Sequence, residues 1–414
     1  MNGFALIGLV LAVTAVLSWI NERWFKLPTA IGVMAGALLL SLSLFGLKAL
    51  GVVGDAWAVG VIEQVDFGDV LMKGMLSFLL FAGALHVDLG DLLHRKWSIL
   101  VLATAGVMFS TVLVGTLFWW LCGWFGFELP YIWALAFGAL ISPTDPVAVL
   151  GVMKNAKAPE GLSSMVAGES LFNDGVGVVV FTVVAGLVAG GGHLDAAHAG
   201  ELFVVEALGG AVFGLVIGWV AYRMLKTIDN HSVEILITLA MVGGGYALAG
   251  LLHTSGPIAM VIAGLFMGNH GRLFGMSDDT RNALDGFWEV VDEILNAVLF
   301  VMIGLELLVL AYSGRRLLLG FAAIPLVLAV RFVAVGIPIS LLRRVREYVP
   351  HTVKLMTWCG VRGGISIALA LSLPPSPNRE LILSVTYAVV VFSVLVQGLT
   401  VAPAVRRALR GSSG

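Results

Sequence analysis

The sequence predicts an all-α polytopic membrane protein with about thirteen transmembrane helices. Of its 414 residues, 59% are hydrophobic and only 12% are charged, whereas about a quarter of the residues in a soluble domain are charged. The mean hydropathy is +0.99. Runs of roughly 20 apolar residues, the length that crosses a bilayer as a helix, recur along the chain. The connections are short, so little room remains for a soluble domain.

Thirteen apolar segments can be delimited. They cover approximately residues 3–20, 28–46, 69–87, 97–121, 130–153, 163–190, 201–222, 232–252, 256–269, 287–312, 316–341, 352–373 and 380–403. The first begins with no basic residue before it and no suitable cleavage site, so it is interpreted as a retained helix and not a signal peptide. An odd number of spans places the two termini on opposite sides of the membrane.

Lysines and arginines predict the orientation, because they concentrate in cytoplasmic loops. One alternate set of loops, with the C-terminal tail, holds sixteen: Arg23, Lys26, Arg95, Lys96, Lys154, Lys157, Arg223, Lys226, Arg272, Arg281, Arg343, Arg344, Arg346, Arg406, Arg407 and Arg410. The other set holds four: Lys48, Arg315, Arg316 and Arg379. We therefore expect an outside N-terminus and a cytoplasmic C-terminus. The net charge of −2 without a basic stripe argues against a nucleic-acid partner.

The fifth segment contains the sequence SPTDP, in which Pro143 and Pro146 flank Thr144 and Asp145. Each proline removes a backbone donor and disfavours a continuous helix, so the helix is predicted to unwind there. A broken helix at membrane depth is tolerated where its backbone is buried in protein or lines a wet cavity. This is the usual construction of a transporter ion site.

The twelfth segment predicts a second unwound helix, because Gly360, Gly363 and Gly364 surround Arg362. Broken segments at corresponding positions of two halves indicate inverted repeats. Segments one to six would pair with eight to thirteen, with the seventh as linker. Close helix packing is the alternative reading of the glycines, but it does not explain the arginine between them.

The sixth segment carries Glu169, Ser170, Asn173 and Asp174. Ser170 and Asp174 are four residues apart and share a helix face, while Glu169 and Asn173 share the neighbouring stripe. Ionisable groups at bilayer depth are costly and mark a transport pathway or a proton relay. Hydroxyl, carboxylate and carbonyl oxygens are hard ligands that suit a small alkali cation better than a transition metal.

We therefore take Asp174 as a shared cation and proton site. Ser170, the Thr144 hydroxyl and carbonyl groups near Asp145 would complete the cation shell, and Asp145 would supply a ligand or a countercharge to the half-helix ends. Burial favours a neutral carboxyl group, and a bound cation favours the charged form. One aspartate can thus hold a proton or a cation, and this competition is all that coupled exchange requires.

Arg331 lies in the middle of the eleventh segment and needs a carboxylate or several carbonyl groups as partners. We expect it to form a structural ion pair with Glu169, although each residue could have another partner. Lys73 and Lys354 lie near segment ends and are interpreted as snorkelling to the interface.

The quoted residues belong to recognisable motifs. SPTDPVAVL, GESLFNDGVGVVVF, FVMIGLEL, the arginine in RFVAV and GVRGGISIALAL closely resemble the monovalent cation:proton antiporter family, in the branch of prokaryotic sodium/proton antiporters related to the eukaryotic sodium/hydrogen exchangers. The resemblance implies Na⁺ and H⁺ as substrates, no cofactor, and a homodimer in the lipid bilayer. It assigns the ion and proton role to Asp174 with Asn173 as its companion in the binding site, the crossing to Thr144 and Asp145, a ligand role to Ser170, and the ion pair to Glu169 and Arg331. It also implies a location in a bacterial inner membrane.

The resemblance also implies a division into domains and a stoichiometry. Residues 1–96 and 191–315 would form the dimerisation and linker helices, and residues 97–190 and 316–403 the moving core. Residues 404–414 would form a short cytoplasmic tail, whose final Gly-Ser-Ser-Gly resembles a cloning remnant. Asn173 occupies a place where the electrogenic branch has a second aspartate, so electroneutral 1:1 exchange is expected.

Three alternatives stay open. A potassium/proton antiporter would use the same ligands, since their chemistry does not separate Na⁺ from K⁺. A cation channel or ion-sensing protein is disfavoured because no repeated filter sequence is visible. A membrane enzyme has little support, since the histidines fall almost entirely in loops or at segment ends. Asp88 and Glu306, near segment ends, are interpreted as helix caps or interface anchors.

Overall fold

A computed structural model describes residues 3–49, 74–145, 147–156, 158–190, 196–306, 314–344 and 348–410 of the chain. All regular secondary structure within these ranges is helical, as the sequence predicts. Lys73 and part of the third and tenth predicted segments lie outside the described residues.

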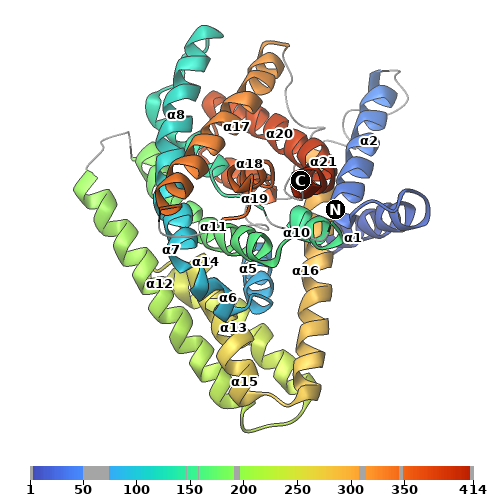
Figure 1. Cartoon of the computed structure of the whole chain (residues 1–414). Coiled ribbons are helices and arrows are strands. Elements are labelled where there is room, and N and C mark those ends of the chain that lie inside the picture. The colour runs from blue at the N-terminus through green and yellow to red at the C-terminus, as the bar shows by residue number, and fades with distance from the viewer. Residues whose placement is uncertain are drawn as a thin grey trace.

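The helices follow one another with short breaks (Figure 1). The first part of the chain forms α1 (Gly3–Ile20), η1 (Asn21–Phe25), α2 (Thr29–Ala49), α5 (Leu76–Leu85), α6 (Leu89–His94), α7 (Lys96–Val101), η3 (Leu102–Gly106) and α8 (Val107–Trp124). The middle part forms α9 (Tyr131–Ile141), α10 (Val147–Asn155), α11 (Glu160–Ala189), α12 (Ala196–Leu225), α13 (His231–Leu251), α14 (Gly256–Phe266), η4 (Met267–Gly271), α15 (Arg272–Gly275) and α16 (Asp278–Glu306). The last part forms α17 (Gly314–Leu342), α18 (Thr352–Trp358), α19 (Gly364–Leu371), α20 (Pro377–Phe392), η5 (Ser393–Gln397) and α21 (Gly398–Arg410). The elements labelled η are π-helical turns.

Each of the thirteen predicted apolar segments overlaps at least one of these helices. The fifth segment is divided into α9 and α10, and the twelfth into α18 and α19, at the two breaks that the sequence predicts. By length and apolar composition, six described helices can cross a membrane, or seven if the bent α1–α2 pair forms one span. Half-helices such as α9 are too short to qualify alone, so the count of thirteen stays a prediction.

The corner between α1 and α2 is sharper than separate apolar runs suggest, since the helix direction changes by 111°. Asn21 is buried at this corner. Its Nδ2 donates to the Leu27 carbonyl at 2.8 Å, and its Oδ1 accepts from the Leu27 amide at 3.3 Å. The side chain thus takes over backbone hydrogen bonds that the turn removes.

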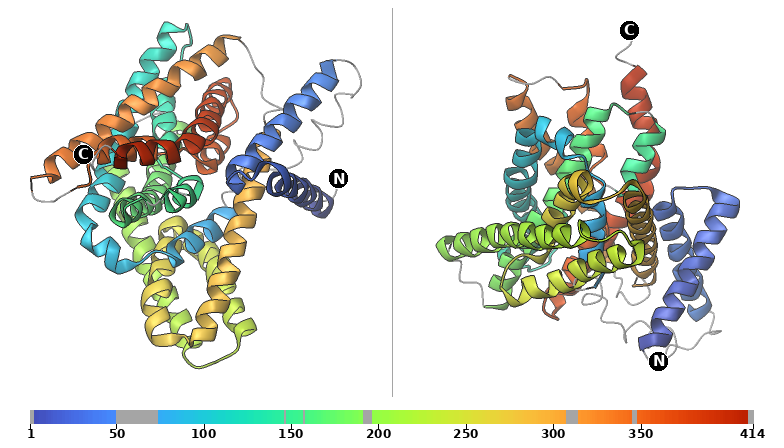
Figure 2. Two further views of the ribbon diagram at one scale, coloured as in Figure 1. Left: turned by 45° about the vertical axis from the view of Figure 1, so that its right-hand side comes forward. Right: turned by 90° about the horizontal axis from the view of Figure 1, so that it is seen from below.

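The closest helix pairings fall into two groups. Helices α7 to α11 pack with one another and with α17 to α21, whereas α5 and α12 to α16 form a second group to which α1 and α2 are joined through α16. In Figure 1 the first group occupies the upper part of the view and α12 to α15 the lower part, with α1 and α2 at the right. Figure 2 shows the same separation of α1 and α2 from α12 in two further directions.

Tight contacts hold the first group together. The rings of Phe118 and Phe137 lie 4.0 Å apart between their centroids, joining α8 to α9. Gly138 of α9 faces the Thr111 carbonyl and the Gly115 amide of α8, where no side-chain atom has room. Such close approach of two backbones suits a membrane interior, in which packing rather than the hydrophobic effect drives helix association.

We expect Gly138→Ala to destabilise the protein by about 1–3 kcal/mol, because the added methyl group collides with the backbone of α8. Thermal melting in detergent would measure the loss. Gly186→Ala on α11 is the matched control, since its methyl group meets nothing within 4 Å. Equal melting temperatures for Gly138→Ala and the unsubstituted protein would contradict this packing.

Candidate functional site

The two broken helices touch through their unwound backbones. The Asp145 amide donates to the Val361 carbonyl at 2.8 Å. A methyl group on Gly363 would overlap the Asp145 side chain, so the crossing requires glycine there. Gly364 is predicted from the sequence to lie in the unwound stretch, but α19 begins at this residue. Gly364 instead packs against Leu299 of α16.

Arg362 joins the two breaks at the end of α9. Its guanidinium is 2% exposed, and Nη1 donates to the Ser142 carbonyl at 2.5 Å and to the Pro143 carbonyl at 2.7 Å. Carbonyl groups at a helix C-terminus lack intrahelical donors and carry the negative end of the helix dipole. A cation at this position therefore stabilises the interrupted helix. The sequence indicated the arginine but not these partners.

Asn173 of α11 fastens the break to the neighbouring helix. Its Oδ1 accepts from the Thr144 amide at 3.1 Å, and its Nδ2 donates to Thr144 Oγ1 at 2.9 Å. The hydroxyl groups of Thr144 and Ser170 lie 2.9 Å apart. All three side chains are buried, and together they form a polar cluster against α11.

Asp174 lies one residue beyond this cluster and is only 5% exposed. It interacts electrostatically with Asp145, Glu169 and Arg362. Within the described ranges, its carboxylate makes no hydrogen bond or ion pair with another residue. A buried carboxylate in this situation lacks the compensation that such groups normally have, which leaves it available to a proton or a cation.

Of the four residues that the sequence suggests as Na⁺ ligands, Thr144 and Ser170 are in contact through their hydroxyl groups, and Asp174 interacts electrostatically with Asp145. Asp145 is half-buried and is coupled electrostatically to Asp174. Within the described part of the chain, no three His, Cys, Asp or Glu side chains gather as metal ligands. The donors fit an alkali cation held by carboxylate and hydroxyl oxygens.

Glu169 and Arg331 form a buried, two-point ion pair. Arg331 Nη1 and Nη2 donate to the two carboxylate oxygens of Glu169 at 2.5 and 2.7 Å, and the side chains are 8% and 1% exposed. Arg331 Nη2 also approaches the Met356 carbonyl at 3.4 Å, near the end of α18. Asn173 Nδ2 reaches Glu169 at 3.4 Å. The pair thus connects α17, α11 and α18.

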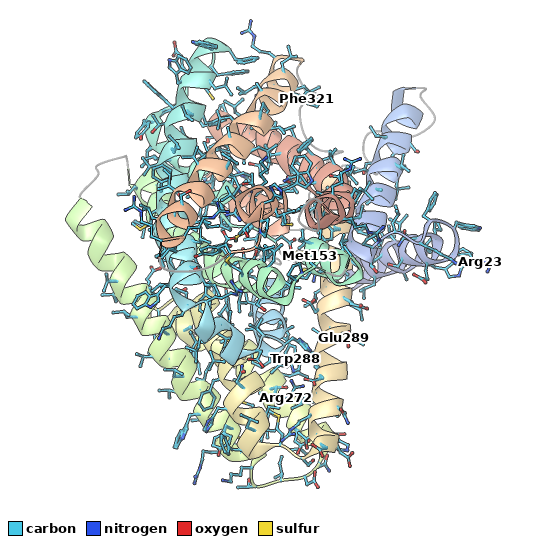
Figure 3. The ribbon with its side chains drawn as sticks, in the orientation of Figure 1. Arg23, Met153, Arg272, Trp288, Glu289 and Phe321 are labelled. Atoms are coloured by element: carbon cyan, nitrogen blue, oxygen red, sulfur yellow. The ribbon has the colours of Figure 1, made fainter. Side chains whose placement is uncertain are left out.

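One acidic residue near the site was missed from the sequence. Asp292 on α16 is half-buried, accepts from Asn296 Nδ2 at 3.1 Å, and interacts electrostatically with Asp145 and His86. Its neighbour Glu289 is labelled beside α16 in Figure 3 and is exposed. The acidic residues within the predicted tenth span were the available signal, because they are expensive in an apolar segment.

Comparison with known proteins identifies the family of the chain. The sequence profile described as "sodium/hydrogen exchanger, transmembrane" matches residues 9–407. The chain belongs to this family. It is 50% identical over 411 residues to the Na(+)/H(+) antiporter NhaP of Pseudomonas aeruginosa, covering 98% of this chain and 97% of that protein. It is 34% identical over 390 residues to the Na(+)/H(+) antiporter NhaH of Halobacillus dabanensis, covering 93% of each.

A solved structure shows the same fold. The sodium proton antiporter MjNhaP1 from Methanocaldococcus jannaschii superposes with a TM-score of 0.76 over 99% of this chain and all of that one, at 20% sequence identity. The chain is therefore an integral membrane protein of the sodium/hydrogen exchanger family with an all-helical fold.

We expect Arg331→Ala to lower stability by about 3–5 kcal/mol, because it leaves Glu169 buried without its countercharge. Thermal unfolding of purified protein would measure the change. Glu380→Gln serves as control, since Glu380 is 60% exposed and pairs with Arg316 at the surface, where ion pairs contribute little. An unchanged melting temperature for Arg331→Ala would show that the buried pair does not stabilise the fold.

Proposed function

We propose that this protein exchanges Na⁺ or Li⁺ for H⁺ across a bacterial inner membrane, one cation for one proton. The observation that carries the proposal is Asp174, a buried carboxylate with no hydrogen bond or ion pair among the described residues, beside the crossing of two broken helices. The names of two relatives, both Na(+)/H(+) antiporters, favour sodium over potassium as the exchanged cation.

Asp174 acts as the exchange site because its two stable states exclude each other. A carboxylate shielded from water is stabilised either by a proton or by a cation. Na⁺ held by Asp174, Asp145, Ser170 and Thr144 would therefore displace the proton. When the proton returns, the cation loses its charged ligand and leaves.

Asn173 determines how much charge moves in each cycle. Its amide group hydrogen-bonds to the Thr144 amide and hydroxyl, and a neutral amide carries no second proton. Because Glu169 is held by Arg331, Asp174 is the residue of this cluster that we assign to exchange. One carboxylate that alternates between one Na⁺ and one H⁺ moves no net charge.

Alternating access would come from movement of a core formed by residues 97–190 and 316–403. The dimerisation helices, residues 1–96 and 191–315, would form a scaffold in a homodimer. The separation of helix packing into two groups supports this division. Contacts between the groups include Gly175 of α11 against Ile258 of α14, and Gly364 of α19 against Leu299 of α16.

The distribution of basic residues supports an outside N-terminus and a cytoplasmic C-terminus. In this orientation η1, with Arg23 at the edge of the molecule in Figure 3, and the loop before α13 face the cytoplasm.

We expect Asp174→Asn to abolish exchange and to leave a folded protein, because the amide can neither release a proton nor neutralise Na⁺. Purified protein in liposomes with an internal pH dye, challenged with Na⁺, Li⁺ and K⁺ in turn, would measure exchange. Asp278→Asn is the matched control, since Asp278 is 90% exposed at the start of α16. Substantial activity of Asp174→Asn would overturn the assignment, and larger exchange with K⁺ than with Na⁺ would overturn the choice of cation.

We expect the Na⁺ gradient that balances a fixed pH gradient to be independent of membrane potential. A net charge moved in each cycle would contribute about 2.3 kcal/mol per 100 mV, or roughly a 50-fold change in that gradient. The same liposomes, with the potential clamped at two values, would distinguish the outcomes. A shift of this size would contradict one-for-one exchange.

A further inference from the structure

A π-helical turn interrupts the helix that runs from α14 to α15. This turn, η4, spans Met267–Gly271 and contains Asn269. Single π-helical turns within helices are rare and frequently occur at functional sites. The hydrogen bonds of Asn269 go to none of the proposed cation ligands, and neither the sequence motifs nor the proposed exchange site gives it a role.

The side chain of Asn269 binds the turn between α5 and α6. Its Nδ2 donates to the Val87 carbonyl at 3.0 Å and to the Leu265 carbonyl of its own helix at 2.9 Å, and its Oδ1 accepts from the Leu89 amide at 2.8 Å. The Leu89 amide is one of the donors that a helix start leaves without an intrahelical acceptor. Such donors usually find an acceptor close in sequence. Here the acceptor comes from a residue 180 positions away.

Before the turn between α5 and α6, the chain packs on the proposed scaffold. Gly264 of α14 lies against the Phe81 carbonyl, and Gly268 lies against the Leu85 carbonyl so closely that a side chain would collide with it. The ring of Phe81 contacts that of Trp288 on α16, with 4.7 Å between their centroids. The end of α5 is therefore held on α14 and α16.

After the turn between α5 and α6, the chain packs on the proposed core. Leu92 of α6 and Ile99 of α7 both lie over Gly168 of α11, where a side chain would overlap Leu92. Between Leu85 and Leu92 the chain thus leaves one packing group and enters the other. The other two junctions between the groups, near residues 191–195 and 307–313, fall partly outside the described residues.

We propose that Asn269 is a positioning residue that fixes where the chain bends when the core moves against the scaffold. It holds Val87 and Leu89 to the helix of α14 and η4, so that bending is confined to the first turn of the short helix α6, between Leu89 and Leu92. Without this anchor the bend spreads into the end of α5, and the two positions of the core become less well defined. This inference rests on the proposed exchange function, because a hinge matters only if the core moves.

The consequence for transport is specific. Hinge residues far from the chemistry affect turnover because they absorb the change in backbone angles during movement. Asn269 is not among the residues that we assign to the Na⁺ shell, so its loss should slow the movement and leave cation binding unchanged. Asn269 thus differs from the residues of the proposed Na⁺ shell, whose loss would weaken cation binding itself.

The decisive experiment compares three variants in the full-length protein. Asn269→Ala removes all three hydrogen bonds, and Asn269→Asp keeps the acceptor for Leu89 but loses both donors. Asn230→Ala is the matched control, since Asn230 also accepts backbone amides at a helix start, that of α13, without touching the α5–α6 turn. Exchange rate per folded protein, half-saturating Na⁺, Na⁺-induced thermal stabilisation and backbone hydrogen exchange would be measured for each.

We expect Asn269→Ala to reduce the maximal exchange rate about tenfold, with half-saturating Na⁺ and Na⁺-induced stabilisation within about twofold of the unsubstituted protein. Hydrogen exchange should increase in peptides covering residues 86–92 and not in those covering α11. Asn269→Asp should fall between, and Asn230→Ala should lower the melting temperature but keep the rate.

Other results would overturn the inference. An unchanged maximal rate in Asn269→Ala, with active unsubstituted protein, would show that Asn269 has only a structural role. A Na⁺ affinity reduced in proportion to the rate would place Asn269 in the binding site instead. No exchange by the unsubstituted protein would remove both this inference and the proposed function, whereas an active Asp174→Asn variant would remove only the assigned exchange site.

Discussion

The site depends on one buried cation, the guanidinium of Arg362, which binds the carbonyl groups at the end of α9. A helix that stops within a membrane exposes backbone acceptors that lipid cannot satisfy. By donating these hydrogen bonds from the other broken helix, Arg362 allows both helices to unwind at the same place. Thr144 and Asp145 lie in the unwound stretch that results, and the cation site that we propose depends on this stretch.

From this crossing, a continuous set of polar contacts spreads into the surrounding helices. Thr144 is bound by Asn173, Asn173 approaches Glu169, and Glu169 is bound by Arg331, which reaches the end of α18. The charges of Glu169 and Arg331 balance each other, so these contacts hold the helices in place and leave Asp174 as the carboxylate open to exchange. On α11, Glu169 and Asn173 thus hold the surrounding helices, and the neighbouring Asp174 is the residue that we assign to exchange.

The sequence predicted the features that arise from local covalent constraints. Prolines beside Asp145 and glycines beside Arg362 limit the backbone conformations of any chain that contains them, so both breaks could be located in advance. The partners of Arg362, the role of Asn269 and the proximity of Asp292 to Asp145 depend on how distant helices pack. The corner at Asn21 is similar, because an asparagine in an apolar run does not reveal which backbone groups it will bind.

The amide of Asn173 also limits how this protein could evolve. Its nitrogen donates to the Thr144 hydroxyl and its oxygen accepts from the Thr144 backbone amide. An aspartate there would keep the second contact, but the first would form only if the Thr144 hydroxyl donated instead of accepting. The new carboxylate would face the Thr144 hydroxyl oxygen and stand near the negative charges of Glu169 and Asp174. A second titrating acid at this position would therefore have to be stabilised against the charges of Glu169 and Asp174. The ratio of ions exchanged is in this sense a property of several residues, and single substitutions are poorly suited to change it.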